Sequence, residues 1–369
     1  MIECRTIKEL CSVVVDCPHS TPTWTAEGKI VVRSNNIKNG RIDFSSPSYT
    51  DDEHFQQRIK RATPQGGDII ITREAPMGEV GMIPEGIVCC LGQRMVLLRA
   101  NPEICDNYYL LYSLQSRYVQ HQISWSEGTG TTVSNLRIPH LEQLKIPYLP
   151  LSKQRQVSSV LRCLEGKIEQ NRVINDNLEQ QAQAIYASMF IDNADPAWQR
   201  GHLSDLVIVR YGKDHKKLAN GIYPVYGSGG IMRHVERPLY DKESVLIPRK
   251  GTLNNVMYVN QPFWSVDTMF YTEMRLPNVA KFVYHFVKAK DLASMNAGSA
   301  VPSMTTDILN AMEVAIPPAS VLEEFESLVT PMYRAMQEND AQSKKLADLR
   351  DTLLPKLMSG EIDVSNIQL

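Results

Sequence analysis

The residues best suited to chemistry in this chain are polar groups that follow predicted strands and carry paired hydrogen-bonding groups. Arg33, Ser34, Asn35 and Asn36 come directly after one such strand. Guanidinium and amide groups can each make two parallel hydrogen bonds to the edge of a nucleic-acid base. This stretch is therefore a candidate for reading DNA bases.

Two more arginines end strands that occupy similar places in the two halves of the chain. GDIIITREA (67–75) contains Arg73, and ESVLIPRKG (243–251) contains Arg249. A basic turn, KDHKK (213–217), lies in the second half. The full set of candidate DNA contacts is Arg33, Ser34, Asn35, Asn36, Arg73, Arg94, Thr129, Thr131, Lys213, Lys216, Lys217, Ser228, Arg249, Lys250 and Asn254. A strand-end arginine can equally form a surface ion pair, and a lysine cluster can be a solvated face.

No catalytic motif accompanies these groups. The sequence lacks the phosphate-binding loop pattern and the nucleophile elbow. The glycines of 227–230 are not followed by a long helix, so a tight turn is the simpler interpretation. Two Glu-Gly-Lys triplets, at 27–29 and 165–167, resemble part of a nuclease motif but lack an Asp on a preceding strand. We therefore expect no catalytic residue, no metal ligand and no cofactor in this chain.

The elements that must position the candidate residues form two globular regions. In 1–150, β-branched or alternating stretches predict strands at 29–33, 68–73, 80–83, 87–91 and 95–99. An aromatic-rich stretch predicts a helix over 107–122, and the Gly-, Ser- and Thr-rich stretch 126–136 predicts a loop. The segment 138–150 is expected to form short strand-like pieces cut by proline.

From about residue 198 a similar but shorter pattern follows. It predicts a Gly-rich strand and turn at 223–231, a strand at 243–251, a helix at 280–290 and a small-residue loop at 295–304, and it places 264–272 where 90–98 lies in the first domain. The fold class is therefore α+β, with two mixed α/β domains at 1–150 and 192–317.

Each domain is followed by a heptad pattern, and the pattern occurs twice. Apolar and small residues recur at steps of four and three between Val157 and Met189, which predicts a long amphipathic helix. The seam reappears without a gap from Phe325 to Leu357, at an offset of 168 residues (325 minus 157), with one break at Arg350. We infer an internal duplication with spacer helices at 151–191 and 318–358, and a tail at 359–369.

The seam also carries polar positions near its centre. Asn171 and Asn175 in the first copy correspond to Asn339 and Ser343 in the second. A duplicated unit that folds on itself places the two helices antiparallel, as an antiparallel coiled coil about a pseudo-twofold axis. That arrangement pairs Asn175 with Asn339 and Asn171 with Ser343, and we expect these pairs to fix the register. The alternative is that the helices separate there and the four residues contact water or a partner helix.

The bulk composition is ordinary for a globular protein, with 43 % hydrophobic and 22 % charged residues. The formal charge is −2, so any nucleic-acid surface must be local. The first 150 residues carry 15 basic and 16 acidic residues, and 191–317 carry 14 and 12. The seven cysteines do not have the spacing of metal ligands, and we expect them to be reduced thiols. The sequence contains no apolar run long enough to span a membrane. We expect a cytoplasmic protein.

Two variable domains, each followed by a repeated helix, resemble the specificity subunit of type I restriction-modification systems. The most specific segments are GTGTTVSNLRIPHLEQLKIPYLPLSKQRQV (128–157), IPPASVLEEF (316–325) and LLPKLMSGEIDV (353–364). The resemblance implies that each domain is a target-recognition domain reading one half of a split DNA sequence. It also implies that the helices set the gap and dock two modification (methyltransferase) subunits, and that a restriction or motor subunit can join.

The same resemblance implies a non-catalytic chain. S-adenosylmethionine, Mg²⁺ and ATP would belong to the partner subunits. The residues alone leave a second hypothesis open, in which a two-domain scaffold without enzymatic activity binds proteins or other ligands. A third and weaker alternative is a free-standing enzyme. A gel shift with random-sequence duplex would separate the first two.

Overall fold

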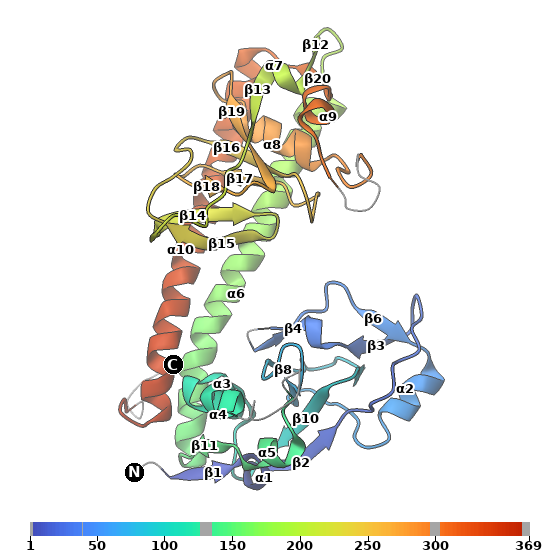
Figure 1. The fold of residues 1–369 in the computed structure, drawn as a ribbon, viewed down its shortest axis with the longest axis vertical. Helices are drawn as coiled ribbons and strands as arrows, with labels where there is room; N and C mark the ends of the chain where they lie inside the picture. Colours follow the sequence, from blue (N-terminus) through green and yellow to red (C-terminus); the bar gives the residue numbers. More distant parts are fainter. Residues whose placement is uncertain (1–2, 39, 126–134, 296–302, 364–369) are drawn as a thin grey trace. The chain divides into compact units, whose positions relative to one another are not determined.

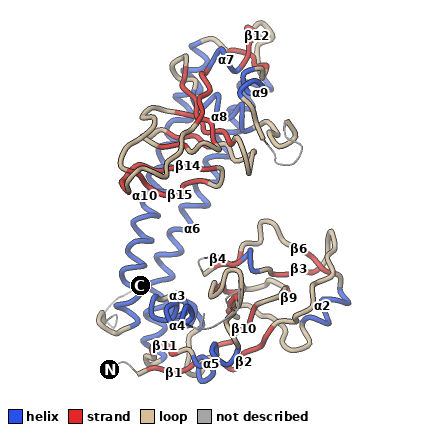
Figure 2. Tube along the Cα trace, viewed as in Figure 1, coloured by secondary structure: helices blue, strands red, loops and turns tan. Residues whose placement is uncertain are grey.

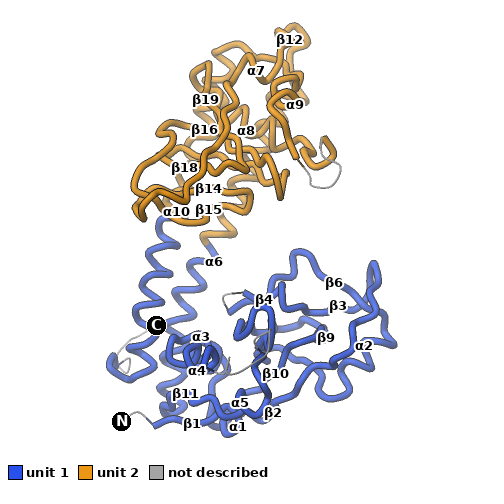
Figure 3. The backbone as a smooth tube through the Cα atoms, in the orientation of Figure 1, with its two compact units in different colours: residues 1–170, 341–369 blue, residues 171–340 orange. Residues whose placement is uncertain are grey.

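The computed structural model describes residues 3–38, 40–125, 135–295 and 303–363 (Figure 1). These residues form two compact units (Figure 3). Unit 1 contains Met1–Gln170 and Ala341–Leu369, and unit 2 contains Asn171–Asp340. Each unit therefore combines one globular domain, called domain one (1–150) or domain two (192–317), with segments of two long helices.

Domain one is built on a four-stranded sheet of order β2-β10-β7-β8 and a three-stranded sheet of order β6-β3-β9. Strand β3 pairs parallel with β9, and the paired strands of the larger sheet are antiparallel. The elements are β1 (Cys4–Thr6), α1 (Ile7–Leu10), β2 (Cys11–Asp16), β3 (Lys29–Val32), β4 (Ile37–Lys38), β5 (Arg41–Ile42), β6 (Ser48–Thr50), α2 (Asp52–Arg58), β7 (Ile69–Thr72), β8 (Val80–Met82), β9 (Cys89–Leu91), β10 (Met95–Ala100), α3 (Asn107–Gln115), α4 (Arg117–Trp125), α5 (Ile138–Gln143) and β11 (Lys145–Pro147).

The central strands of domain one are apolar on both faces because both faces are covered. All four residues of β7 are buried, as are the first four residues of β10. Ile69 and Ile71 belong to one apolar cluster, whereas Ile70 belongs to another on the opposite face of the sheet. The rigid centre of the sheet thereby fixes the positions of the loops at its strand ends.

Domain two repeats this topology. Its larger sheet has the order β13-β19-β16-β17, its smaller sheet the order β15-β14-β18, and β14 pairs parallel with β18. The elements are β12 (Gln199–His202), α7 (Leu203–Leu206), β13 (Val207–Tyr211), β14 (Asn220–Gly227), β15 (Gly230–Val235), β16 (Ser244–Pro248), β17 (Met257–Val259), β18 (Trp264–Ser265), β19 (Met269–Met274), α8 (Ala280–Lys288), α9 (Thr306–Asn310) and β20 (Glu313–Ile316). The matching strand orders show that the duplication includes the globular domains as well as the helices.

The two long helices are α6 (Leu151–Ala187) and α10 (Ala319–Met358), drawn as the longest helical stretches in Figure 2. In unit 1, Leu161 packs near Leu357, and Glu165 pairs with Arg350 at 3.4 Å. In unit 2, the later α6 residue Tyr186 packs against the earlier α10 residue Phe325. Within each unit the α6 and α10 segments therefore run antiparallel, as the duplicated seam predicts. Arg350, the break in the seam, finds its partner in Glu165.

One helix of each domain packs against the long helices. In unit 1, α3 contributes Tyr112, whose hydroxyl donates to Glu165 on α6 at 3.0 Å. In unit 2, α8 contributes His285, which is fully buried between α6 and α10. Its Nδ1 lies 2.7 Å from Gln183 Oε1, and its Nε2 lies 2.9 Å from the Tyr333 hydroxyl. Burial lowers the pKa of His285 to about 4, so the ring is neutral at physiological pH.

Two sequence predictions need correction. Segment 138–150 contains a strand, β11, but its first half is the helix α5. Proline is tolerated in the first turn of a helix, where its missing N–H has no intrahelical partner. The helix predicted over 107–122 is divided into α3 and α4 at Ser116, whose backbone is extended (φ −62°, ψ 146°).

Candidate nucleic-acid interface

In domain one, backbone hydrogen bonds join the ends of four strands into one edge. The N–H of Cys17, after β2, donates to the carbonyl of Met95 at 3.0 Å. The N–H of Arg73, after β7, donates to Arg94 at 2.8 Å, and that of Gly92 donates to Val32 of β3 at 2.8 Å. We call this the strand-end edge of domain one. It brings together the neighbourhoods of Arg33, Arg73 and Arg94.

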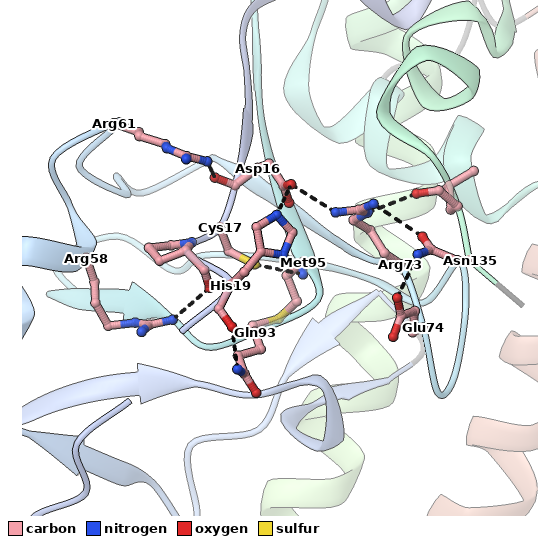
Figure 4. Close-up of polar contacts among 12 residues, drawn as sticks. Asp16, Cys17, His19, Arg58, Arg61, Arg73, Glu74, Gln93, Met95 and Asn135 are labelled. Carbon is pink, nitrogen blue, oxygen red and sulfur yellow. Dashed lines mark hydrogen bonds and ion pairs between the residues drawn. The ribbon is translucent and has the colours of Figure 1, made fainter. Parts of the chain in front are cut away.

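Arg73 does not extend outward from this edge, and its predicted contact with DNA stays a prediction. Only 12 % of its side chain is exposed. Figure 4 shows its guanidinium between three segments: Nη1 donates to Asp16 at 2.9 Å, Nε to the Leu136 carbonyl at 2.9 Å, and Nη2 to Asn135 at 3.3 Å. Arg73 thus clamps the end of β2 to the chain that enters α5.

A buried arginine that the sequence did not reveal holds the loop after β2. Arg58, at the end of α2, is 7 % exposed. It donates to the carbonyls of Leu91 and Gly92 at 2.8 and 2.9 Å, and to those of Pro18 and Ser20 at 3.3 and 3.1 Å. Burial lowers the pKa of Arg58. No periodic signal marks its role, because its four partners are all main-chain oxygens.

The other candidates of domain one lie at its surface. Arg33 and Asn35 are exposed, and Ser34 and Asn36 are partly exposed. The Arg33 guanidinium lies 5.2 Å from the centre of the Trp24 ring, and Asn36 Oδ1 accepts the Arg33 N–H at 2.9 Å. Arg94 has a left-handed backbone (φ 64°) and its Nε lies 3.2 Å from Glu74. Thr129 and Thr131 lie outside the described residues.

Domain two has the equivalent strand-end edge. The N–H of Gly212, after β13, donates to Met269 at 3.0 Å, and that of Val266 donates to Tyr226 of β14 at 3.1 Å. Arg249 follows β16 as Arg73 follows β7. Their carbonyls accept the N–H groups of Met304 and Leu136, at 2.9 and 3.0 Å, respectively. The predicted equivalence of the two arginines is therefore correct in backbone geometry.

The candidate residues of domain two meet at this edge. Lys213, Lys216, Lys217, Lys250 and Asn254 are exposed. The Trp264 indole N–H donates to the Lys213 carbonyl at 2.8 Å, and the Lys250 N–H donates to Thr268 at 3.2 Å. Asn255 donates to the carbonyl of Ser228 at 2.8 Å, which places the β14–β15 turn beside the loop after β16. Asn254 is engaged with Asp291 at 3.1 Å.

The polar layer predicted in the helix pair lies within unit 2 for three of its four residues. Asn339 Nδ2 donates to Asn175 Oδ1 at 2.8 Å, and Asn175 Nδ2 donates to Asp340 at 2.8 Å and to the Met336 carbonyl at 3.2 Å. Asn171 is fully buried and donates to the Asn339 carbonyl at 3.3 Å. The predicted contact between 175 and 339 is present. Its role in fixing the register, and the predicted pairing of Asn171 with Ser343, stay predictions.

Other kinds of site are not apparent in the part of the chain that the structure describes. There, no group of three or more His, Cys, Asp or Glu side chains is placed to hold a metal ion. None of the described helices has the length and apolar character needed to cross a membrane.

Comparison with protein families assigns the chain to a family. The model of the type I restriction modification DNA specificity domain matches residues 3–180 and 197–328, which is most of the chain. The chain belongs to this family. The two matches each include one domain and part of a long helix, in agreement with the duplication of the specificity-domain fold.

Individual relatives agree with this assignment. The specificity subunit of the type I restriction enzyme MjaIX of Methanocaldococcus jannaschii is 23 % identical over 345 residues, covering 82 % of this chain and 79 % of that protein. A putative type I specificity subunit of Mycoplasma genitalium is 23 % identical over 280 residues, covering 70 % of this chain and 72 % of that protein. The crystal structure of an S subunit from M. genitalium superposes with a TM-score of 0.58 at 20 % identity, covering 97 % and 96 % of the two chains.

Proposed function

We propose that this specificity-domain protein is the DNA-reading subunit of a type I restriction-modification complex, and that each domain reads one half of a bipartite target at its strand-end edge. The observation that carries the proposal is the repetition of one edge in two domains of the same topology. In both, loops on a rigid sheet gather guanidinium, amide or ammonium groups, which suit phosphates and base edges.

The helices set the unread gap between the half-sites. The 37 residues of α6 span about 56 Å at 1.5 Å per residue. One turn of duplex is about 34 Å. The helix length therefore suits two domains that read one duplex face between one and two turns apart.

Modification subunits dock on the long helices and supply the methyl transfer. Leu328 of α10 in unit 2 and Leu349 of α10 in unit 1 are large apolar residues that are 47 % and 45 % exposed. In the proposed complex these two side chains would lie in the docking surface. The chain itself is not catalytic, and S-adenosylmethionine, Mg²⁺ and ATP belong to the partner subunits, which include a restriction or motor subunit in a cleaving complex.

Selection from a random duplex pool tests this function. The chain, assembled with its modification subunits, should enrich two short conserved blocks separated by a fixed number of variable bases. Asn35→Ala should alter preference within one block only, because Asn35 is exposed beside the edge of domain one. A pool without enrichment, or with one uninterrupted block, would contradict the proposal.

A further inference from the structure

The two strand-end edges have the same backbone hydrogen bonds. They differ in whether acidic side chains lie beside their basic side chains. Asp16, the last residue of β2, corresponds to Tyr211, the last residue of β13, since the residue after each donates its N–H to the β10 or β19 strand at 3.0 Å. Arg73 corresponds to Arg249 by the same reasoning. The surroundings of equivalent cations can therefore be compared position by position.

In domain one, carboxylates lie beside Arg73 and Arg94, two of the three arginines of the edge, whereas the exposed Arg33 lies over the Trp24 ring. Asp16 lies 2.9 Å from Arg73 and 3.1 Å from His19, as Figure 4 shows. Glu74 lies 3.2 Å from Arg94. The loop after β2 contributes no lysine or arginine over 17–21, and its carbonyls at Pro18 and Ser20 are held by Arg58. A phosphate that approached Arg94 would either displace Glu74 from the guanidinium or be repelled by the Glu74 carboxylate.

In domain two, no carboxylate of the described residues forms an ion pair with the cations of the edge. Tyr211 replaces the aspartate, and the Arg249 guanidinium lies 5.3 Å from its ring centre, an interaction that orders the group and keeps its charge. The loop after β13 carries Lys213, Lys216 and Lys217, all exposed.

Among the described residues, no carboxylate oxygen lies within 4.0 Å of the ammonium group of Lys213, Lys216, Lys217 or Lys250. The nearby Asp214 accepts the Lys216 backbone N–H at 3.1 Å, and this hydrogen bond lowers the pKa of that carboxyl. Asp214 therefore shapes the turn, and the charge of Lys216 acts on this carboxyl without a direct ion pair between the two side chains. The four exposed ammonium groups lie on this turn and on the neighbouring loop, and no carboxylate of the described residues pairs with them.

We propose that domain two supplies most of the grip on the DNA phosphate backbone, through Lys213, Lys216, Lys217 and Lys250, while domain one reads its half-site with fewer cations that lack an acidic partner. This inference rests on the proposed DNA-reading function. Exposed, uncompensated ammonium groups bind phosphate as point charges, whereas ion-paired guanidinium groups are already oriented and contribute little to long-range attraction. The two halves of the target are then bound by different physical means.

The salt dependence of binding measures this division. Each phosphate neutralised by a cation contributes about 0.9 to the slope of log K against log salt. The full chain, assembled with its modification subunits, would be titrated by fluorescence anisotropy against a random-sequence duplex about three turns long at several KCl concentrations. Lys216→Gln and Lys217→Gln should each reduce the slope by about 0.9, so that a fourfold rise in salt weakens binding about 3.5-fold less than in the wild type.

Matched changes in domain one provide the controls. Arg94→Gln removes an exposed but ion-paired cation and should leave the slope within about 0.3 of the wild-type value. Glu74→Gln releases Arg94 from its partner and should raise the slope, a gain that a folding defect cannot imitate. Equal losses of slope for Arg94→Gln and Lys216→Gln, or no gain for Glu74→Gln, would overturn the inference.

Failure of the inference is distinguishable from failure of the proposed function. If the wild-type assembly enriches a bipartite site but the two domains contribute equally to the salt slope, only the division of labour is wrong. An assembly that binds no duplex at any salt concentration contradicts both.

Discussion

A strand-end arginine has different surroundings in the two domains, although the backbone around it is the same. The sequence indicates the position of Arg73 and Arg249, because each ends an apolar strand. It does not indicate the partner, since Asp16 is 57 residues away from Arg73 and no local pattern connects them. Arg58 was missed for the same reason. The ends of the strands could therefore be predicted from the sequence. The hydrogen-bond and ion-pair partners of the side chains at those ends could not.

Breaking the Arg73 clamp should destabilise domain one. Removing one partner of a partly buried pair leaves the other with an unmet charge, so Arg73→Ala should lower the free energy of unfolding by about 2 kcal/mol. Arg249→Ala is the matched control, because its guanidinium lies over Tyr211 with no carboxylate partner among the described residues. Chemical denaturation measures both, and equal costs would show that the clamp adds nothing.

By the same comparison, we predict that Arg249 belongs to the DNA-reading surface of domain two. Arg249→Ala should weaken specific DNA binding by about 1–3 kcal/mol and relax base preference in the second half-site alone. Selection from a random pool before and after the change measures both effects. Unchanged preference in both half-sites would mean that Arg249 is a surface residue without a role in reading.

The buried ring of His285 should make unit 2 sensitive to acid. Its folded pKa of about 4 lies below the unfolded value of about 6.5, so its contribution to stability is complete above pH 6.5 and is lost as pH falls towards 4. The loss should reach roughly 3 kcal/mol, at about 1.4 kcal/mol per unit of pKa. His285→Gln should flatten this part of the stability profile. A wild-type profile as flat as that of the variant would exclude the assignment.

At the scale of elements, the long helices were the most predictable part of the chain. Their seam repeats without a gap, because an insertion would turn every later apolar residue away from the partner helix. The strands of the two domains carry no such residue-by-residue match, yet their pairing order is the same. Strand pairing depends on alternating burial and tolerates loops of any length between the strands. The sequence therefore indicated the order of the elements along the chain, but it did not indicate that the two domains have the same sheet topology. The helix α5 was missed because proline suggested a break where it occupies a first turn.

Substitutions in the polar layer test whether its hydrogen bonds hold the helix pair in register. Asn175→Leu removes hydrogen bonds to Asn339, Asp340 and the Met336 carbonyl, and should cost about 1–3 kcal/mol. The double change of Asn175 and Asn339 to leucine leaves fewer unmet groups and should recover much of that loss. Thermal unfolding of the single and double variants measures the coupling. Additive effects would mean that the two amides do not depend on each other.

At the scale of the whole molecule, one fold occurs twice in a single chain with two different edges. Such a molecule can combine independent half-sites, because each domain has its own core and its own loops. The repeated helices, together with the resemblance of segments such as 128–157 to a known family, predicted this organisation. It could not predict the target bases, since base readout depends on loop geometry in the complex.

The central claim is that the two domains read the half-sites and that the long helices set the gap between them. The most direct test maps methylated bases across the genome of cells carrying this chain and its modification subunits. The comparison is a variant with one heptad inserted at matched positions of α6 and α10, which preserves the seam and lengthens each helix by about 10 Å, or about 3 base pairs. We predict the same two half-sites with a gap about 3 base pairs longer. Altered half-sites with the original gap would contradict the account.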